Sequence, residues 1–283
     1  MKIYGLNKTT LLDYPGHVAA AVFLGGCNCR CPFCQNGDLV LRPESQAEIG
    51  EEELFAFLKK RKGILSGVCI TGGEPTLEKE LGELAGKIKE MGYLVKLDTN
   101  GLRPEVVGEL LEDGLLDYIA MDVKNSMERY GETVGSSPIN TICWPSISAA
   151  RQTGDSSRAV PSLLIMALPG GYAENTMKNS MERYGETVGL EKIDVGKIRE
   201  TIDLMMASGI DYEFRTTVVK ELHGKKDIEA IGEEIRGAKA YFLQSYQESQ
   251  GVIAPVFHSY SREEMEELAE AVRPFVPGAQ VRG

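Results

Sequence analysis

The sequence lacks an apolar stretch of membrane-spanning length, and its first residues lack the basic-then-apolar pattern of a signal peptide. We therefore expect a cytoplasmic chain with no membrane partner. Basic residues are also not in excess, because 31 Lys and Arg stand against 42 Asp and Glu, for a net charge of −11. This charge disfavours a general nucleic-acid surface and is compatible with a small-molecule cofactor and a protein partner.

A second ligand pair for zinc is absent as well. Zinc sites usually combine two separated cysteine pairs, or a cysteine pair with a histidine pair, and neither a second C-x2-C nor an H-x3-H occurs. The sequence does contain four of its six cysteines within eight residues. Three of them, Cys27, Cys31 and Cys34, form a C-x3-C-x2-C array. Thiolates this close on a loop suit an iron–sulfur cluster or zinc, and three ligands leave one iron of a [4Fe–4S] cluster open for a substrate or cofactor.

This array resembles the cluster loop of the radical S-adenosylmethionine (SAM) enzymes, in which an aromatic residue precedes the last cysteine, here Phe33. Gln35-Asn36 and the Leu-Asp-Tyr-Pro-Gly run at 12–16 resemble the glycyl-radical-enzyme activases, above all those that activate anaerobic ribonucleoside-triphosphate reductase. The resemblance implies a [4Fe–4S] cluster on the three cysteines of the array, with the amino and carboxylate groups of SAM on the open iron.

The resemblance also implies an activity and partners. One electron from the cluster would cleave SAM to methionine and a 5'-deoxyadenosyl radical, which would abstract a hydrogen from a glycine of a partner enzyme. The implied reductant is flavodoxin or ferredoxin. Cys29 departs from the family pattern, because reading it as a ligand gives C-x1-C-x2-C. We interpret Cys29 as a non-ligand, with substitution in a damaged cluster as the alternative.

Short apolar runs predict six strands, and helical patterns separate or follow them. Residues 1–17 carry turn signals and are predicted to be an N-terminal extension. Strand–helix alternation predicts an α/β fold with a parallel sheet, and six units are too few for a closed eight-stranded barrel. The resemblance implies a partial (β/α)6 TIM-like barrel with the cluster loop after its first strand. The predicted strands are 18–24, 68–71, 93–97, 117–123, 212–219 and 240–244, and the helices are 51–62, 77–91, 104–111, 195–208, 227–236 and 261–272.

Polar motifs follow several of these strands. Gly72 and Gly73 allow a ligand to approach the backbone closely, and Glu74 can accept from an ammonium group, although G-G-E-P alone could be a turn. Asp98 and Lys124 follow neighbouring strands, at the end of a strand–helix barrel where the chemistry lies. A capping Asp and a solvated Lys are the alternatives.

The resemblance adds roles for these residues. It implies that Gly72, Gly73 and Glu74 hold the amino group of SAM. Asp98, Asp122 and Lys124 would lie near SAM, and Phe33 would contact its adenine. His223, in a loop after the fifth strand, matches a family position near the adenosine only loosely, and a solvated histidine is the alternative.

An identical twelve-residue segment, Lys-Asn-Ser-Met-Glu-Arg-Tyr-Gly-Glu-Thr-Val-Gly, occurs at 124–135 and 178–189. Complete identity indicates a duplication rather than a structural repeat, which would keep only a pattern. We infer a single domain over 1–283 with an irregular 54-residue insertion at about 136–189, because 178 − 124 = 54. Residues 136–177 are read as a poorly packed excursion, with a lid as the alternative. The two copies would compete for one packing site, and only Lys124 follows a strand.

Two other functions stay open. The first is a radical SAM enzyme that acts on a small molecule, similar to 7-carboxy-7-deazaguanine synthase. The second is a non-catalytic iron–sulfur or zinc module. SAM cleavage stimulated by a small substrate alone would favour the first, and no SAM cleavage after cluster reconstitution would favour the second.

Overall fold

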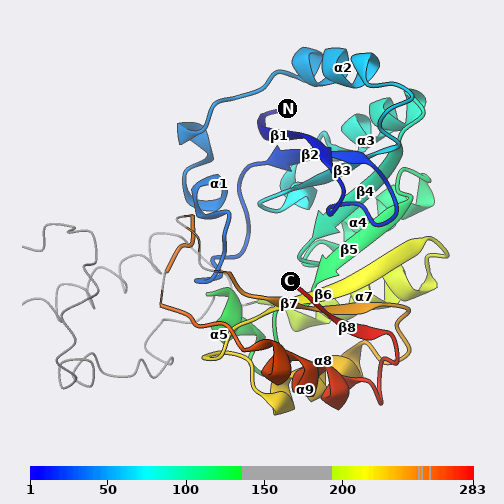
Figure 1. Ribbon diagram of the computed structural model, residues 1–283. Coiled ribbons are helices and arrows are strands. Elements are labelled where there is room, and N and C mark those ends of the chain that lie inside the picture. Colours follow the sequence, from blue (N-terminus) through cyan, green and yellow to red (C-terminus); the bar gives the residue numbers. More distant parts are fainter. Residues whose placement is uncertain (136–192, 248, 250, 255) are drawn as a thin grey trace, which may run out of the picture.

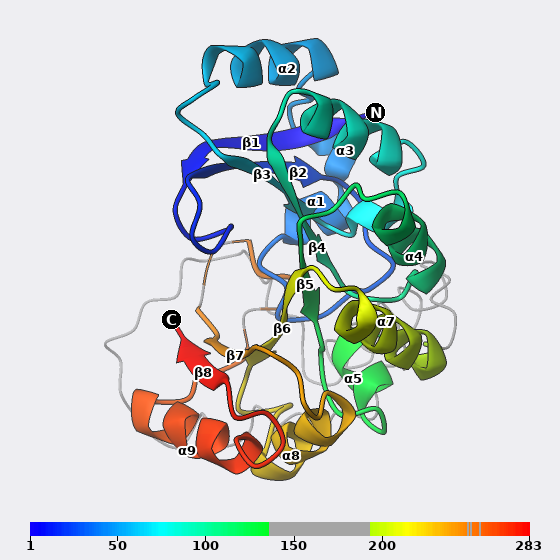
Figure 2. The same cartoon turned by 90° about the vertical axis from the view of Figure 1, so that its right-hand side faces the viewer.

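The computed structural model describes residues 1–135, 193–247, 249, 251–254 and 256–283. In these ranges eight strands form one sheet, and their spatial order is their order in the chain (Figure 1). The sheet curls, but β1 and β8 are not paired, so the barrel stays open on one side (Figure 2). The strands are β1 (Ile3–Thr10), β2 (Ala19–Leu24), β3 (Gly67–Gly72), β4 (Leu94–Thr99), β5 (Tyr118–Asp122), β6 (Asp211–Val218), β7 (Tyr241–Ser245) and β8 (Ala279–Arg282).

The six predicted strands are confirmed as β2 to β7, which all run parallel. The prediction for residues 1–17 is wrong, because Ile3–Thr10 form β1, antiparallel to β2. Asn7, Lys8 and Thr9 are exposed on this edge strand, so it lacks the apolar run that marks the buried strands. The four-residue strand β8 was not predicted either.

Helices cover the outside of the sheet, with α2, α3 and α4 beside one half and α8 and α9 beside the other (Figure 1). In α3, for example, Leu81, Leu84 and Ile88 are buried at helical spacing. The helix predicted over 77–91 begins only at Leu81, because Pro75–Leu77 form a 3-10 turn. The helices are α1 (Gly37–Leu41), α2 (Glu51–Lys60), α3 (Leu81–Glu90), α4 (Pro104–Glu112), α5 (Tyr130–Val134), α7 (Val195–Ala207), α8 (Lys225–Glu234) and α9 (Arg262–Val272), and Pro43–Ser45 form another 3-10 turn.

None of the helices in the described ranges combines the length and the apolar character that a bilayer crossing requires.

The first copy of the duplicated segment, 124–135, is packed into the domain. Asn125, Tyr130 and Val134 are fully buried in it. The Asn125 amide donates to Thr133 Oγ1 at 2.7 Å and to the Leu222 carbonyl at 3.0 Å, which ties the segment to the loop after β6. The second copy and the insertion at 136–189 lie outside the described residues, so their competition for this place stays a prediction.

Candidate active site

The carboxyl ends of β2 to β7 surround a cavity of about 330 Å³. Ten of the eleven site residues predicted from the sequence line it, although they come from four separate segments of the chain. These ten are Cys27, Cys31, Phe33, Cys34, Gly72, Gly73, Glu74, Asp98, Asp122 and Lys124. The parallel strands end at one edge of the sheet, which brings these segments together.

The cysteine loop follows β2 and is held by backbone hydrogen bonds from distant segments. Glu74 N donates to the Gly26 carbonyl at 2.8 Å, and Arg30 N donates to the Val134 carbonyl at 2.9 Å. The loop after β7 supports the other end of the cysteine loop, because Ala254 N donates to the Pro32 carbonyl at 2.8 Å. The position of the cysteines therefore depends on the whole barrel.

The cysteine thiols differ in their surroundings. Burial raises the pKa of Cys34 to about 11, whereas a hydrogen bond from Cys29 holds the pKa of Cys31 below its ordinary value. The pKa of Cys29 is raised by its hydrogen bonds with Cys27 and Cys31 and by burial. Thiol ligands must be deprotonated to bind metal, so Cys34 has to lose its proton when a metal group enters.

The donor set fits a cluster better than a single ion. Cys27, Cys31 and Cys34 line one cavity, yet in the described residues no three His, Cys, Asp or Glu side chains meet closely enough to hold one metal ion. A [4Fe–4S] cluster binds each cysteine through a different iron, so its ligands do not need to converge on one point. Part of the cavity wall beside the cysteines is glycine backbone, which leaves room for a group in the cavity.

That glycine wall is Gly72-Gly73. Gly72 has φ +119°, a conformation that favours glycine, and a Cβ atom on Gly73 would lie 1.8 Å from the Gly26 carbonyl oxygen. These two glycines therefore allow the G-G-E-P turn to lie directly against the cysteine loop. Asn36 supports the same contact, because its side-chain amide donates to the Gly72 carbonyl at 2.9 Å.

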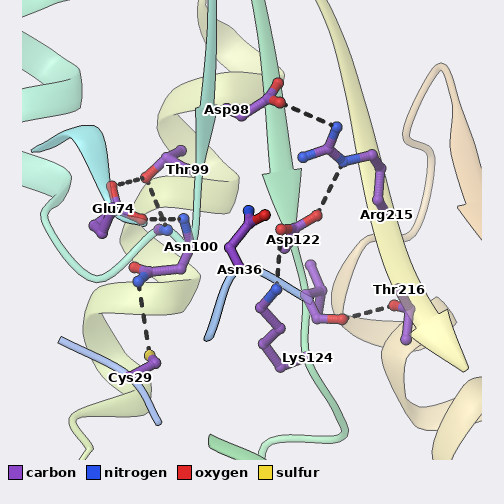
Figure 3. Close-up of polar contacts among 12 residues, drawn as sticks. Cys29, Asn36, Glu74, Asp98, Thr99, Asn100, Asp122, Lys124, Arg215 and Thr216 are labelled. Atoms are coloured by element: carbon purple, nitrogen blue, oxygen red, sulfur yellow. Dashed lines mark hydrogen bonds and ion pairs between the residues drawn. The ribbon is translucent and has the colours of Figure 1, made fainter. Parts of the chain in front are cut away.

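Glu74 is completely buried, and its carboxylate joins the ends of β3 and β4 (Figure 3). Oε1 accepts from Thr76 N at 3.1 Å, Thr76 Oγ1 at 2.6 Å and Thr99 Oγ1 at 2.8 Å, and Oε2 accepts from Asn100 N at 2.7 Å. Burial raises the pKa of Glu74 even though these four donors oppose the shift. Among the described residues, Oε2 accepts a single hydrogen bond, so it is the oxygen that can still accept from a ligand.

The other side of the cavity is built from ion pairs (Figure 3). Arg215 Nε donates to Asp122 Oδ1 at 2.9 Å and its NH1 lies 3.5 Å from Asp98 Oδ2, while Lys124 Nζ donates to Asp122 Oδ2 at 2.9 Å. Lys96, which is buried, also pairs with Asp98. Burial alone would raise the pKa of Asp122, but Arg215 and Lys124 hold it well below its ordinary value. The Asp122 carboxylate therefore stays ionised at neutral pH.

The structure does not place His223 in the cavity lining. The residue is fully buried, its Nδ1 accepts from Val219 N at 3.1 Å, and its Nε2 lies 2.7 Å from the Lys124 carbonyl oxygen. Because Nδ1 accepts, Nε2 carries the proton and donates to Lys124. Burial lowers the pKa of His223, which favours this neutral form. His223 therefore holds the backbone that carries Lys124, and its expected contact with SAM stays a prediction.

Sequence reasoning missed two residues of the site. Arg215 lies within the predicted strand 212–219 and had no assigned role, although it joins the carboxylates at the ends of β4 and β5. Asn100 follows the predicted strand 93–97 and had no assigned role, although its amide reaches the cysteine loop. Strand alternation offered a signal for Arg215, because it shares the inner face of β6 with Thr217, which also lines the cavity.

Comparison with known proteins adds independent findings. The family model described as the Radical SAM superfamily matches residues 22–152. A protein of Methanocaldococcus jannaschii, named as a glycyl-radical enzyme activating enzyme, is 30% identical over 246 residues, which are 87% of this chain and 80% of that protein. The 7-carboxy-7-deazaguanine synthase of Hyperthermus butylicus is 37% identical over 92 residues, which are 32% of this chain and 38% of the synthase.

Solved structures support the fold. The crystal structure of Streptococcus suis SuiB bound to precursor peptide SuiA superimposes with a TM-score of 0.60 at 12% sequence identity. The match covers 93% of this chain and 48% of SuiB, so the chain spans about half the length of that protein. The partial barrel predicted from the sequence is therefore confirmed.

Proposed function

We infer that this chain, which belongs to the radical SAM superfamily, is an activase that generates a glycyl radical on a partner enzyme. The observation that carries this proposal is the extent of its similarity to the Methanocaldococcus jannaschii protein, which spans 87% of the chain rather than the cluster loop alone. Anaerobic ribonucleoside-triphosphate reductase is the partner we propose, and flavodoxin or ferredoxin is the reductant.

Different residues of the cavity would bind the cluster and SAM. Cys27, Cys31 and Cys34 would hold the [4Fe–4S] cluster of the superfamily, and Gly72-Gly73 would let SAM lie against the backbone. When bound, the cluster and SAM together supply one-electron bond cleavage and a hydrogen-abstracting radical, whereas the protein supplies orientation and electrostatics. Oε2 of Glu74, which accepts from Asn100 N at 2.7 Å, would also accept from the ammonium group of SAM.

The ion-pair side would orient the rest of SAM. Lys124 and Arg215 present cations to the cavity for a carboxylate, and Asp98 and Asp122 present acceptors for hydroxyl groups. These charges are paired before a ligand arrives, so they need little rearrangement when it binds. Phe33 lines the same cavity and makes an edge contact with Phe257, and its ring would contact the adenine.

We propose that the partner's glycine approaches through the mouth of the barrel, close to where the insertion leaves after Gly135. The insertion would then hinder partner activation more than SAM cleavage. Removing 136–189 yields the same 229-residue chain as removing 124–177, because the two flanks are identical. The shortened chain should activate the partner faster at an unchanged rate of SAM cleavage. Equal activation by both chains would contradict this role of the insertion.

The function is tested with anaerobically reconstituted protein. Iron and sulfide are counted first, and SAM cleavage is then measured under dithionite with and without anaerobic ribonucleotide reductase. We expect four irons per chain, SAM cleavage, and a glycyl-radical signal in the reductase by electron paramagnetic resonance (EPR). The Cys31→Ala variant should show neither cleavage nor signal. SAM cleavage without a glycyl radical on any tested partner would contradict the activase proposal.

The similarity to 7-carboxy-7-deazaguanine synthases makes a small-molecule reaction the second candidate. That similarity covers about a third of this chain, in contrast to the 87% covered by the activating enzyme. The same assay separates the two, because a small-molecule enzyme would cleave SAM faster when its substrate is added and would not respond to the reductase.

A further inference from the structure

Lys96 is a buried cation of β4 that lies next to the cavity without lining it. Its side chain is 1% exposed, and its ammonium group pairs with Asp98 Oδ1. Nζ also lies 3.8 Å from Cys69 Sγ and 5.7 Å from the centroid of the Tyr118 ring. Asp98 lines the cavity and Lys96 does not, so Lys96 acts on a bound ligand through Asp98.

Arg215 forms ion pairs with three carboxylates, and each of these carboxylates has a second cation of its own. The pairs with the second cation are Asp98 with Lys96, Asp122 with Lys124 and Glu213 with Arg282. Among the described residues, the Arg215 guanidinium makes one hydrogen bond, from Nε to Asp122 Oδ1 at 2.9 Å. NH1 stays 3.5 Å from Asp98 Oδ2 and 4.0 Å from Glu213 Oε1. Most of the guanidinium N–H groups are therefore not committed to an acceptor in this part of the chain.

Asp98 would bind Arg215 more fully if Lys96 did not hold it. Figure 3 shows the Arg215 guanidinium between Asp98 and Asp122, and all three residues line the cavity. A buried carboxylate has to be paired, and a guanidinium offers it two parallel N–H donors. Without Lys96, Asp98 would therefore turn both oxygens to Arg215 and occupy the donors that the carboxylate of a ligand needs.

We propose that Lys96 is a positioning residue, which holds Asp98 so that Arg215 stays available for the carboxylate of SAM. This inference rests on the placement of SAM in the cavity under the proposed function. Lys96 then sets how strongly the cavity prefers a ligand that carries a carboxylate. Decarboxylated SAM keeps the adenosine, the sulfonium and the amino group, so the ratio of its Kd to that of SAM measures this preference. Any contact of the carboxylate with iron is common to all variants, so differences between variants report on the cations of the protein.

The test is anaerobic equilibrium dialysis of the reconstituted full-length protein without reductant, so that SAM is bound but not cleaved. Wild type should bind SAM more tightly than decarboxylated SAM. Lys96→Met should reduce this preference on the order of tenfold, because Asp98 then competes with the ligand carboxylate for charge-assisted hydrogen bonds from Arg215. Adding Asp98→Asn to Lys96→Met should recover the preference, because a neutral amide no longer captures the guanidinium. A general loss of packing would not be reversed by this second substitution.

Lys89→Met is the matched control. Lys89 pairs with Asp117 at 2.8 Å, just before the amino end of β5, so its loss should leave the preference unchanged. Asp98→Asn alone should keep at least the wild-type preference, and it carries the test if Lys96→Met does not fold. An unchanged preference in Lys96→Met, or a lower one in Asp98→Asn, would overturn the inference. Failure of wild type to bind SAM would instead contradict the proposed function, which the other two outcomes leave intact.

Discussion

The two sides of the cavity are built by different interactions. On the side of β3 and β4, glycine backbone lies against the cysteine loop, and the Glu74 carboxylate accepts four hydrogen bonds from neutral donors. On the side of β5 and β6, Arg215 and Lys124 are paired with carboxylates. Close backbone contact tolerates almost no added volume, whereas paired charges tolerate changes of shape but not the loss of one partner. Substitutions on the two sides should therefore fail in different ways.

The largest effect is expected on the glycine side. Gly73→Ala would place a methyl group 1.8 Å from the Gly26 carbonyl oxygen, so the cysteine loop must move. A displacement of about 1 Å at reacting groups costs on the order of 100-fold in rate, and iron content should fall with it. Gly82→Ala is the control, because its Cβ would lie 3.7 Å from Leu115. Normal iron content and SAM cleavage in Gly73→Ala would show that the loop contact is not needed.

On the ion-pair side, Arg215→Met should act through stability. The change leaves the Asp98 and Asp122 carboxylates without the guanidinium that both contact, and removing one partner of a buried pair costs about 3 kcal/mol. Urea denaturation of the apo protein measures the loss. The exposed pair of Arg199 with Glu234 provides the comparison, since Arg199→Met should cost far less. Equal losses of stability in the two variants would mean that the ion pairs of Arg215 contribute no more stability than an exposed pair.

Glu74→Gln tests whether charge or hydrogen bonding matters on the glycine side. The amide oxygen can replace Oε1, but the amide nitrogen would face the Asn100 N–H donor, leaving a buried donor unpaired at a cost of about 2 kcal/mol. Thermal denaturation should show the loss in the apo protein, with Glu53→Gln on the exposed face of α2 as the control. A stable Glu74→Gln protein with weaker SAM binding would instead assign Glu74 to the ligand alone.

The smallest effect concerns pH. Because the pKa of buried His223 is lowered, the unfolded chain binds a proton more readily than the folded chain. The stability from neutral His223 is complete above the unfolded pKa of about 6.5 and is lost as pH falls below it, by about 1.4 kcal/mol per unit at most. Denaturation midpoints at several pH values should show this loss in wild type and in the exposed-site control His258→Gln, but not in His223→Gln. A loss of stability of the same size in His223→Gln would show that other groups cause the pH dependence.

Part of this site could be predicted from the sequence because its motifs are local. The spacing of Cys27, Cys31 and Cys34 within eight residues predicts thiolate ligands for a cluster. Gly72-Gly73 predicts a backbone that a ligand can approach closely. The buried parallel strands were predicted for a similar reason, since an apolar run is a local signal. Edge strands β1 and β8 escaped prediction, because an exposed or very short strand has no such run.

The remaining features depend on residues that are far apart in the chain. Arg215 pairs with Asp122 across 93 residues, and the Asn100 amide reaches Cys29 across 71. Nothing in the sequence near Arg215 or Asn100 indicates these partners, because the register of neighbouring strands decides them. His223 shows the opposite case, in which a residue expected at the ligand is turned toward the backbone of Lys124 by the packing around it.

The sequence by itself determined the kind of chemistry, since thiolate spacing and glycine backbone are properties of short segments that survive in any arrangement of the barrel. Only the tertiary structure decided which charges face the cavity and which donors touch the cysteine sulfurs. The physical reason is distance: a hydrogen bond or ion pair acts over a few ångströms, and only the folded sheet brings the ends of its strands that close.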